Sequence, residues 1–445
     1  MKYKKVTLVS LGCAKNLTDS EVMLSKLSKA GYEITNVDSE AEIAIVNTCC
    51  FIDSAKQESI DAILDVAKNK IDGKLKLLIV AGCMGERFKD EVLSELPEVD
   101  GVCGTGDFAD ICSIIEKCEQ ERGVYASGCL NAPLDEDERI LATPSYTAYL
   151  KIAEGCSNHC TYCVIPSVRG KYRSRPLEGI ITEAKKLAKN GVKELILIAQ
   201  DTSCYGKDLG EEITLVTLLR KLSEIEGLKW IRVHYLYPEE ITDELIDEFA
   251  ENSKIVNYFD IPIQHINNRI LKLMARRTDK GSIETLIGKI KSKMPDAVLR
   301  TSLIVGFPTE TEQEFYELVS FLKEHKLQRV GAFPYSREDG TKAALMSGQV
   351  DDDIKNLRCE KISDLQYEIM SEYATSKIGT VQTVLVEGFD RMIKMYFGRT
   401  YGESVDVDPK VFIKSETNIK QGSFIDVLIT DAVDGDLIGE YKEEL

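Results

Sequence analysis

The stretch CSNHCTYC at residues 156–163 places three cysteines in the spacing CxxxCxxC, directly after a predicted β-strand. Three thiolates on one short loop can bind three irons of a 4Fe-4S cluster, which leaves the fourth iron without a protein ligand. Zinc is the alternative metal, with His159 as a further ligand. Because the loop lies at the ligand-binding end of a predicted barrel strand, we interpret it as an iron–sulfur site.

Residues 146–376 alternate between short apolar runs and helical patterns, which is typical of a parallel α/β sheet. Six strands are predicted, and each except the last precedes a helical stretch. They cover residues 148–153, 194–199, 230–235, 258–263, 298–305 and 330–334. Six such units are too few for a closed eight-unit barrel. We therefore expect an open, partial (β/α)6 barrel that ends with a helix at 351–376.

The regions on either side of this barrel have different patterns. Residues 1–130 show strands at 6–10, 43–46 and 77–80 between helical stretches, which predicts a second parallel sheet. Residues 131–145 contain two prolines and an acidic run, so we interpret them as a linker. Residues 377–445 contain no helical pattern and predict a small all-β domain. Its expected strands are 381–388, 392–398, 404–407 and 423–432.

A second set of three cysteines is spread along the first domain. Cys13, Cys49 and Cys83 each follow one of its predicted strands. The carboxyl ends of parallel strands meet at one edge of a sheet, so these three side chains are expected to converge there. Cysteine is also a common small core residue, which is the alternative. Three equivalent positions favour a binding site.

Composition limits the possible partners and compartment. The 445-residue chain has a formal net charge of −18, and 43% of its residues are hydrophobic. This acidity argues against general attraction to nucleic acid phosphates and suits a basic partner. Thirteen cysteines without an export signal indicate metal ligation rather than disulfides. With no apolar run long enough to span a bilayer, we expect a cytoplasmic protein without membrane contact.

Together these motifs resemble the radical S-adenosylmethionine methylthiotransferases. Cys156, Cys160 and Cys163 match the loop of the radical S-adenosylmethionine (SAM) superfamily, and the contexts LGC, NTC and GC around Cys13, Cys49 and Cys83 match the family's N-terminal domain. The resemblance implies that each triad binds a 4Fe-4S cluster and that residues 377–445 form a TRAM domain, which is OB-like. It also implies that one SAM molecule yields a 5'-deoxyadenosyl radical, while another methylates sulfur at the N-terminal cluster.

Two details of the motifs leave alternatives open. The family usually has glycine after the NTC cysteine, and this chain has Cys50 there, so Cys50 competes with Cys49 as a ligand. We retain Cys49 because it occupies the motif position. Tyr162, beside the last ligand of the second loop, is expected to pack near the SAM adenine or within the core.

Further stretches are similar to the subclass that methylthiolates an aspartate β-carbon on small ribosomal subunit protein twelve. These stretches are residues 9–16, 165–170, 173–176, 200–202, 235–238 and 333–341. The alternative subclass modifies adenosine in tRNA. Residues 379–445 carry 13 acidic and 7 basic side chains, which suits a basic ribosomal protein better than tRNA. A merely solvated acidic surface, or a non-catalytic scaffold with zinc at the cysteines, would also fit this charge.

Other polar residues are predicted at the carboxyl ends of the barrel strands. They are Gln200, Asp201, His234, Gln264, His265 and Arg300, of which Gln200 and Arg300 join Tyr162 as expected cofactor contacts. A structural role is expected for the histidines. The basic run Arg169, Lys171, Arg173 and Arg175 suits phosphate, a carboxylate substrate, a solvated rim or pairing with the linker. No catalytic residue is assigned, and an electron donor protein is expected as a second partner.

Overall fold

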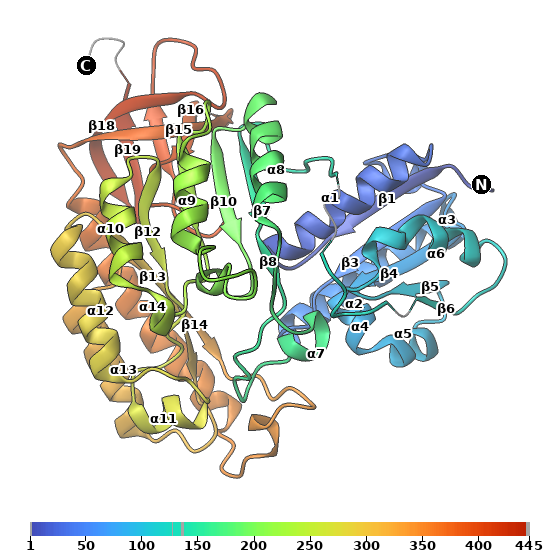
Figure 1. Ribbon diagram of the computed structural model, residues 1–445, viewed down its shortest axis with the longest axis horizontal. Coiled ribbons are helices and arrows are strands. Elements are labelled where there is room, and N and C mark those ends of the chain that lie inside the picture. The colour runs from blue at the N-terminus through green and yellow to red at the C-terminus, as the bar shows by residue number, and fades with distance from the viewer. Residues whose placement is uncertain (1, 127, 135–137, 442–445) are drawn as a thin grey trace.

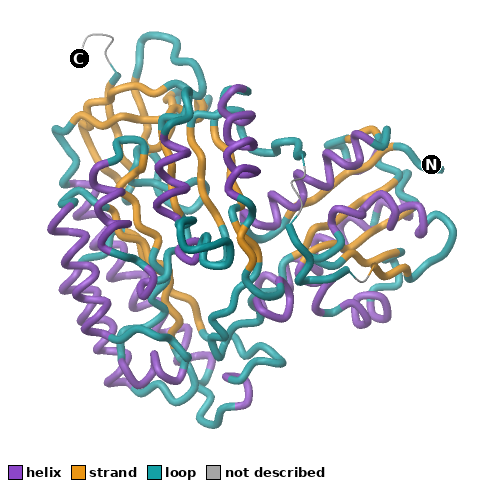
Figure 2. Tube along the Cα trace, viewed as in Figure 1, coloured by secondary structure: helices purple, strands orange, loops and turns teal. Residues whose placement is uncertain are grey.

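The computed structural model describes residues 2–126, 128–134 and 138–441 (Figure 1). The acidic run 135–137 of the expected linker and the two glutamates at 443 and 444 lie outside the described residues. The described chain forms two six-stranded parallel sheets, a closed five-stranded barrel and a two-stranded ribbon (Figure 2).

The N-terminal sheet has the strand order β2-β1-β3-β4-β5-β6, and all of its strands are parallel. Its strands are β1 (Lys5–Ser10), β2 (Glu33–Ile34), β3 (Ile43–Thr48), β4 (Leu77–Gly82), β5 (Gly101–Cys103) and β6 (Val124–Ala126). The central strands β3 and β4 are buried along their whole length. Continuous apolar runs of this kind form because helices cover both faces of the sheet.

The covering helices bury apolar side chains on opposite faces of this sheet. Helices α1 (Ala14–Lys29) and α6 (Ile111–Cys118) contribute to one apolar cluster. Helices α2 (Asp53–Ala67), α4 (Cys83–Arg87) and α5 (Lys89–Glu95) contribute to the other. A short helix, α3 (Asn69–Asp72), follows α2. Helix α1 also contacts the first strand of the second sheet, so it lies between the two α/β regions (Figure 1).

The second sheet confirms the open (β/α)6 barrel. Its order is β14-β13-β12-β11-β10-β7, with all neighbours parallel. The strands are β7 (Thr147–Lys151), β10 (Glu194–Ile198), β11 (Trp230–Val233), β12 (Ile255–Asp260), β13 (Val298–Val305) and β14 (Arg329–Pro334). The ribbon β8 (Ala153–Glu154) and β9 (Arg173–Ser174) lies beside the cysteine loop.

Helices pack against this sheet and bury a large core of Leu, Ile and Val side chains. They are α8 (Leu177–Lys189), α9 (Leu215–Ser223), α10 (Asp243–Glu251), α11 (Asn268–Leu273), α12 (Lys280–Lys293), α13 (Glu312–His325) and α14 (Asp352–Thr375). The short helix α7 (Ile165–Arg169) follows the cysteine loop, and its Val168 joins an apolar cluster of the N-terminal sheet instead. Single-turn helices lie at Asp38–Glu40, Phe108–Asp110, Thr202–Cys204, Pro238–Glu240 and Ala343–Leu345.

The C-terminal region is a closed barrel with the order β15-β16-β17-β19-β18. Its strands are β15 (Val381–Asp390), β16 (Met395–Arg399), β17 (Val411–Lys414), β18 (Phe424–Val433) and β19 (Asp436–Glu440). This barrel packs on the amino ends of the second sheet's strands: Arg399 binds Glu194, the first residue of β10, and the Phe424 ring meets Trp230, the first residue of β11. The cysteine loop lies beyond the opposite, carboxyl ends.

One predicted strand of this region is wrong. Residues 404–407 form a turn, because their polar groups are satisfied outside any sheet. The Ser404 N–H donates to Asp408 Oδ2 at 2.8 Å, and the Ser404 hydroxyl lies 3.1 Å from His234 Nε2 in the second sheet region. Asp406 adopts a positive φ of 63°, which breaks an extended run. Strands β17 and β19 take the place of this strand in the barrel.

Candidate functional site

The N-terminal cysteines lie at the carboxyl ends of three adjacent strands. Cys13 precedes α1, Cys49 follows β3, and Cys83 is the first residue of α4, directly after β4. Strands β1, β3 and β4 are neighbours, so the predicted convergence at one edge is what the sheet produces. The backbone approaches Cys49 closely: a Cβ added at Gly12 would lie 2.7 Å from Cys49 Cβ and 3.1 Å from its Sγ.

The three thiols are close enough for the charge of one to shift the pKa of another. The pKa of the Cys83 thiol is raised to about 11, mainly by burial; Arg169 opposes this rise, and the charges of Cys13 and Cys49 contribute to it. Burial also raises the pKa of Cys49. Burial also acts to raise the pKa of Cys13. The charges of Lys15 and Arg169 outweigh this effect, so the pKa of Cys13 lies below its usual value. The two cations therefore favour the thiolate, which is the form that binds metal, at Cys13, whereas burial favours the neutral thiol at Cys49 and Cys83.

Cys50 lies in a different environment from Cys49. Its side chain is fully buried in the apolar cluster on one face of the N-terminal sheet, and burial raises its pKa to about 12. Cys49 is half-buried, and its backbone N–H donates to Ser59 Oγ at 3.0 Å, while the Ser59 hydroxyl donates back to the Cys49 carbonyl. The charge of Cys83 also raises the pKa of Cys50, so Cys49 stays the predicted third ligand on the ground of its motif position.

The CxxxCxxC loop runs from β8 to α7 and is folded by its own backbone. The Cys163 N–H donates to the Cys160 carbonyl at 3.1 Å, and the Ile165 N–H donates to Cys163 Sγ at 3.4 Å. The pKa of Cys156 is raised to about 11, mainly by burial, with contributions from the charges of Asp201 and Cys160. Burial likewise raises the pKa of Cys163, with further increases from the charges of Cys160 and Cys156. All three thiols of this loop therefore lie near one another.

The two donor sets match the ligand number of an open 4Fe-4S cluster. Within the described ranges, no group of three or more His, Cys, Asp or Glu side chains is arranged to hold one metal ion. His159, the possible extra zinc ligand, is exposed and has a positive φ of 52°. Each site instead offers three thiols, one for each of three irons, and this is the ligand number that an open 4Fe-4S cluster requires.

A buried arginine that no sequence pattern marks lies beside the second triad. The Arg276 side chain stacks on the Tyr237 ring, with its Cζ 4.1 Å from the ring centroid, and its Nη1 lies 4.0 Å from Cys160 Sγ. The Tyr237 hydroxyl is 3.8 Å from the same sulfur. Charged residues are normally read as surface positions, so only the tertiary structure reveals this cation.

Two of the predicted polar residues lie next to the cysteine loop. The Gln200 amide donates to Glu154 Oε1 at 2.5 Å, and Gln200 Oε1 is buried without a hydrogen-bond partner in the described part of the chain. Asp201 accepts a hydrogen bond from the Asn158 amide, inside the loop, at 2.7 Å. Burial raises the pKa of Glu154, but Lys151 and Arg169 outweigh it and lower the pKa to about 2.

The other predicted residues occupy different surroundings. Tyr162 packs against an apolar cluster that includes Phe307 and Tyr335. Arg300 is the third of eight residues in β13, so its expected position at the carboxyl end of the strand is wrong, and the Asp260 charge raises its pKa against the effect of burial. His234 contacts Ser404, and burial lowers its pKa well below the usual value.

His265 and Gln264, the last two predicted polar residues, lie in the segment after β12. His265 is buried, its Nδ1 accepts a hydrogen bond from the Asn267 N–H at 3.0 Å, and burial lowers its pKa to about 4. The imidazole is therefore neutral at physiological pH. Gln264 adopts a positive φ of 70° and forms an isolated bridge with Leu303 of β13.

The basic run after the cysteine loop separates into different environments. Arg169 is buried and forms ion pairs with Asp19 of α1 and Glu154 of β8, at 2.6 and 3.3 Å. Arg175 is also buried, and its Nη1 pairs with Glu183 at 2.7 Å. Lys171 is exposed. Arg169 is therefore an internal cation that joins the N-terminal region to the barrel, a role outside the alternatives that the sequence suggested.

Comparisons with known families divide the chain in three. Residues 5–104 match the uncharacterized protein family UPF0004, residues 150–322 match the radical SAM superfamily, and residues 378–441 match the TRAM domain. Within the described ranges, no helix is long and apolar enough to cross a membrane.

Two curated relatives align along almost the whole chain. Ribosomal protein uS12 methylthiotransferase RimO of Thermoanaerobacter sp. (strain X514) is 49% identical over 439 residues, which cover 98% of this chain and 100% of the relative. The protein of the same name from Clostridioides difficile (strain 630) is 48% identical over 444 residues, which cover 99% of each chain.

A solved structure shares the fold at low identity. The radical S-adenosylmethionine methyltransferase TsrM from Kitasatospora setae, with cobalamin and a 4Fe-4S cluster bound, superposes with a TM-score of 0.58 at 14% identity. The match covers 86% of this chain and 80% of that structure.

Proposed function

The chain belongs to the radical SAM methylthiotransferase family of ribosomal protein uS12 methylthiotransferase RimO, and from this premise we propose that it adds a methylthio group to the β-carbon of an aspartate in uS12. The observation that carries the proposal is structural. Two triads of mutually close thiols lie at the carboxyl ends of two parallel sheets, and Arg169 contacts a cysteine of one triad from the helix that follows the other.

Each triad would hold one 4Fe-4S cluster. Cys13, Cys49 and Cys83 form the ligand set of the N-terminal cluster, and Cys156, Cys160 and Cys163 form that of the second. When bound, a cluster with three protein thiolates keeps one iron open, where SAM binds for reductive cleavage at one site and sulfur is held for methylation and transfer at the other.

The chain's own residues bind and orient these groups. We propose that Gln200 contacts SAM, because its Oε1 is a buried acceptor beside the loop and has no partner within the described ranges. Tyr162 would close the apolar side of the same region, where it packs against Phe307. Arg300 is left out of this set, since its charge faces Asp260 and it is only the third of the eight residues of β13. Electrons would come from a separate reductant protein.

A protein substrate fits the chain's charge better than tRNA does. The C-terminal barrel region carries 13 acidic and 7 basic residues over 379–445, and an acidic surface repels phosphate while it attracts a basic ribosomal protein. Relatives at 48 and 49% identity carry the name of a ribosomal protein enzyme, which supports the same choice. Modification of a ribosomal protein also supports the expected cytoplasmic location.

The test is mass spectrometry of uS12 and of digested tRNA from cells with and without this gene. We expect loss of about 46 Da, the mass of a methylthio group replacing hydrogen, from one aspartate peptide of uS12 in the deletion strain. Loss from a tRNA adenosine with unchanged uS12 would contradict the proposal.

Complementation with cysteine variants adds a second arm. Changing Cys156, Cys160 and Cys163 to Ala should abolish SAM cleavage. Changing Cys13, Cys49 and Cys83 to Ala should leave cleavage but stop sulfur insertion, because only the N-terminal cluster is lost. Sulfur insertion by the second variant would contradict the assignment of that cluster.

A further inference from the structure

Helix α7 spans the distance between the two cysteine triads. It begins at Ile165, two residues after Cys163, and packs on α4, whose first residue is Cys83. Val168 of α7 belongs to the apolar cluster of the N-terminal sheet, and its carbonyl accepts a hydrogen bond from the Thr105 hydroxyl. The helix is therefore anchored in the N-terminal region although it follows the loop of the barrel. Its last residue, Arg169, lies where the two regions meet.

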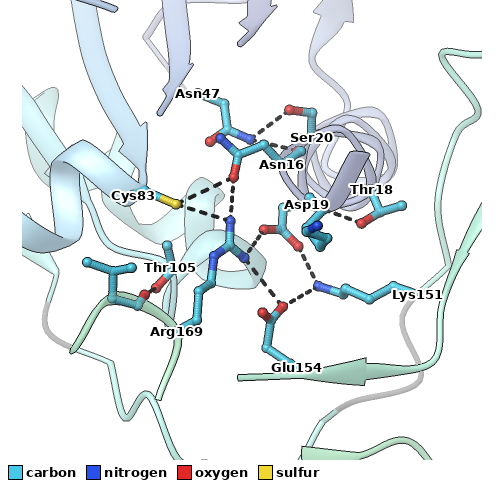
Figure 3. Close-up of polar contacts among 12 residues, drawn as sticks. Asn16, Thr18, Asp19, Ser20, Asn47, Cys83, Thr105, Lys151, Glu154 and Arg169 are labelled. Atoms are coloured by element: carbon cyan, nitrogen blue, oxygen red, sulfur yellow. Dashed lines mark hydrogen bonds and ion pairs between the residues drawn. The ribbon is translucent and has the colours of Figure 1, made fainter. Parts of the chain in front are cut away.

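The Arg169 guanidinium uses both of its terminal nitrogens (Figure 3). Nη1 donates to Asp19 Oδ2 at 2.6 Å and to Glu154 Oε2 at 3.3 Å. Nη2 donates to the Asn16 side-chain oxygen and to Cys83 Sγ, the latter at 3.5 Å. Only 4% of the side chain is exposed. Its planar fork is thus held on one edge by carboxylates and directed on the other at a cysteine of the N-terminal triad.

The residues that hold Arg169 are themselves fixed. The Lys151 ammonium lies 2.5 Å from Asp19 Oδ1 and 2.9 Å from Glu154 Oε2, so the two carboxylates are clamped between two cations. The Asn16 amide donates to the carbonyls of Leu11 and Thr48, each in a strand-end segment that carries a cysteine. The direction of the N–H group towards Cys83 Sγ is therefore set by the interface between the two regions.

We propose that Arg169 is a positioning residue that delivers a buried positive charge and an N–H···S hydrogen bond to the N-terminal cluster and thereby sets its reduction potential. The inference rests on the proposed function, because it requires a cluster on Cys13, Cys49 and Cys83. Reduction adds an electron to the cluster. A nearby cation and a hydrogen bond to a ligand sulfur stabilise the reduced form, so they raise the potential. Because α7 also follows the other cysteine loop, the same side chain ties the two cluster loops together.

The experiment is a redox titration, followed by electron paramagnetic resonance, of the full-length chain reconstituted with iron and sulfide. Cys156, Cys160 and Cys163 are changed to Ala in the parent, so that only the N-terminal cluster contributes a signal. Into this parent we introduce Arg169→Met, Arg169→Lys and, as the matched control, Arg175→Met. Arg175 is another buried arginine of the same run, and its partners include Glu183 and the Lys151 carbonyl.

We expect Arg169→Met to lower the equilibrium constant for reduction of the cluster at least tenfold. For a one-electron couple this is a fall in reduction potential of about 59 mV. Arg169→Lys should give a smaller fall, because one ammonium keeps the charge but cannot serve both sets of partners. Arg175→Met should keep the parent potential. Equal potentials in Arg169→Met and Arg175→Met would overturn the proposal. If Arg169→Met fails to bind iron, the test uses Arg169→Lys instead. A reduction potential of Arg169→Lys equal to that of Arg175→Met would then overturn the proposal.

The parent chain separates this inference from the proposed function. If the parent binds no iron, the N-terminal cluster does not exist and the proposed function fails with it. If the parent binds a cluster whose potential is insensitive to Arg169, only the inference fails.

Discussion

Replacing Glu194 with Gln tests how the C-terminal barrel is held on the second sheet. Glu194 is fully buried at the start of β10 and binds two buried arginines. Its Oε1 accepts from Arg232 Nε at 3.1 Å, and its Oε2 accepts from Arg399 Nη2, in the C-terminal barrel, at 2.6 Å. Glutamine keeps the shape of this side chain but removes the charge that compensates both guanidinium groups.

Two estimates of the stability lost in Glu194→Gln agree. Burial alone raises the pKa of Glu194, but Arg399 and Arg232 outweigh it and lower the pKa from 4.5 to about 2. At about 1.4 kcal/mol per pKa unit, the charged form stabilises the fold by about 3 kcal/mol. Removing one partner of a buried ion pair costs about 3–5 kcal/mol. We therefore expect Glu194→Gln to lower the free energy of unfolding by about 3 kcal/mol.

The chain contains a natural probe of this interface. Trp230 is the single tryptophan, and its ring meets the Phe424 ring edge to face, with centroids 4.7 Å apart. Urea titration of the cluster-free protein, followed by tryptophan fluorescence, reports separation of the C-terminal barrel from the sheet. With a urea dependence of about 1–3 kcal/mol per molar, the midpoint should fall by about 1–3 M. Glu211→Gln, at an exposed position, is the matched control and should keep the wild-type midpoint.

The pH dependence gives a sharper test. A carboxyl group whose pKa is lowered in the folded state adds stability above its unfolded pKa, near 4.5, and loses it as the pH falls towards 2. The difference between wild type and Glu194→Gln should therefore be constant at neutral pH and shrink below about pH 4.5. A midpoint equal to that of Glu211→Gln, or a difference that does not change in acid, would refute this account.

Two further substitutions test the N-terminal triad. Cys50→Ala should leave iron bound per chain unchanged, because this side chain is fully buried, whereas Cys49→Ala, at the half-buried motif position, should lower it; equal losses would contradict the assignment. Gly12→Ala should also lower bound iron, since a Cβ there would lie 2.7 Å from Cys49 Cβ and the φ of +85° adds a cost of about 1–2 kcal/mol. Gly123→Ala, with a φ of +73° and no neighbour within 4 Å of the added Cβ, is its control and should lose stability but no iron.

The central strands could be predicted because their apolar runs are long and strongly patterned. The bounds of β13, Val298–Val305, agree with the expected strand, and the predicted strands before Cys13, Cys49 and Cys83 place these residues at one edge of the sheet. Strands β17 and β19 were missed because neither alternates with a helical stretch, which is the pattern that marks β10 and β11.

Other features depend on contacts between distant residues. The segment 404–407 was predicted as a strand because alternation was the only local signal, and its turn is held by His234, which is remote in sequence. Arg169 and Arg276 were not predicted as internal groups beside sulfur, because a charged side chain is usually exposed and nothing local marks these two. Only the packing of the two α/β regions creates the carboxylate pocket that accepts Arg169.

The position of the C-terminal barrel sets how far a partner held there must reach. It packs on Glu194 and Trp230, at the amino ends of the strands, whereas the CxxxCxxC loop lies beyond their carboxyl ends. The eight residues of β13 alone separate these ends by about 26 Å. A protein held by that barrel must therefore reach at least this far along the side of the sheet to bring its target residue to the loop.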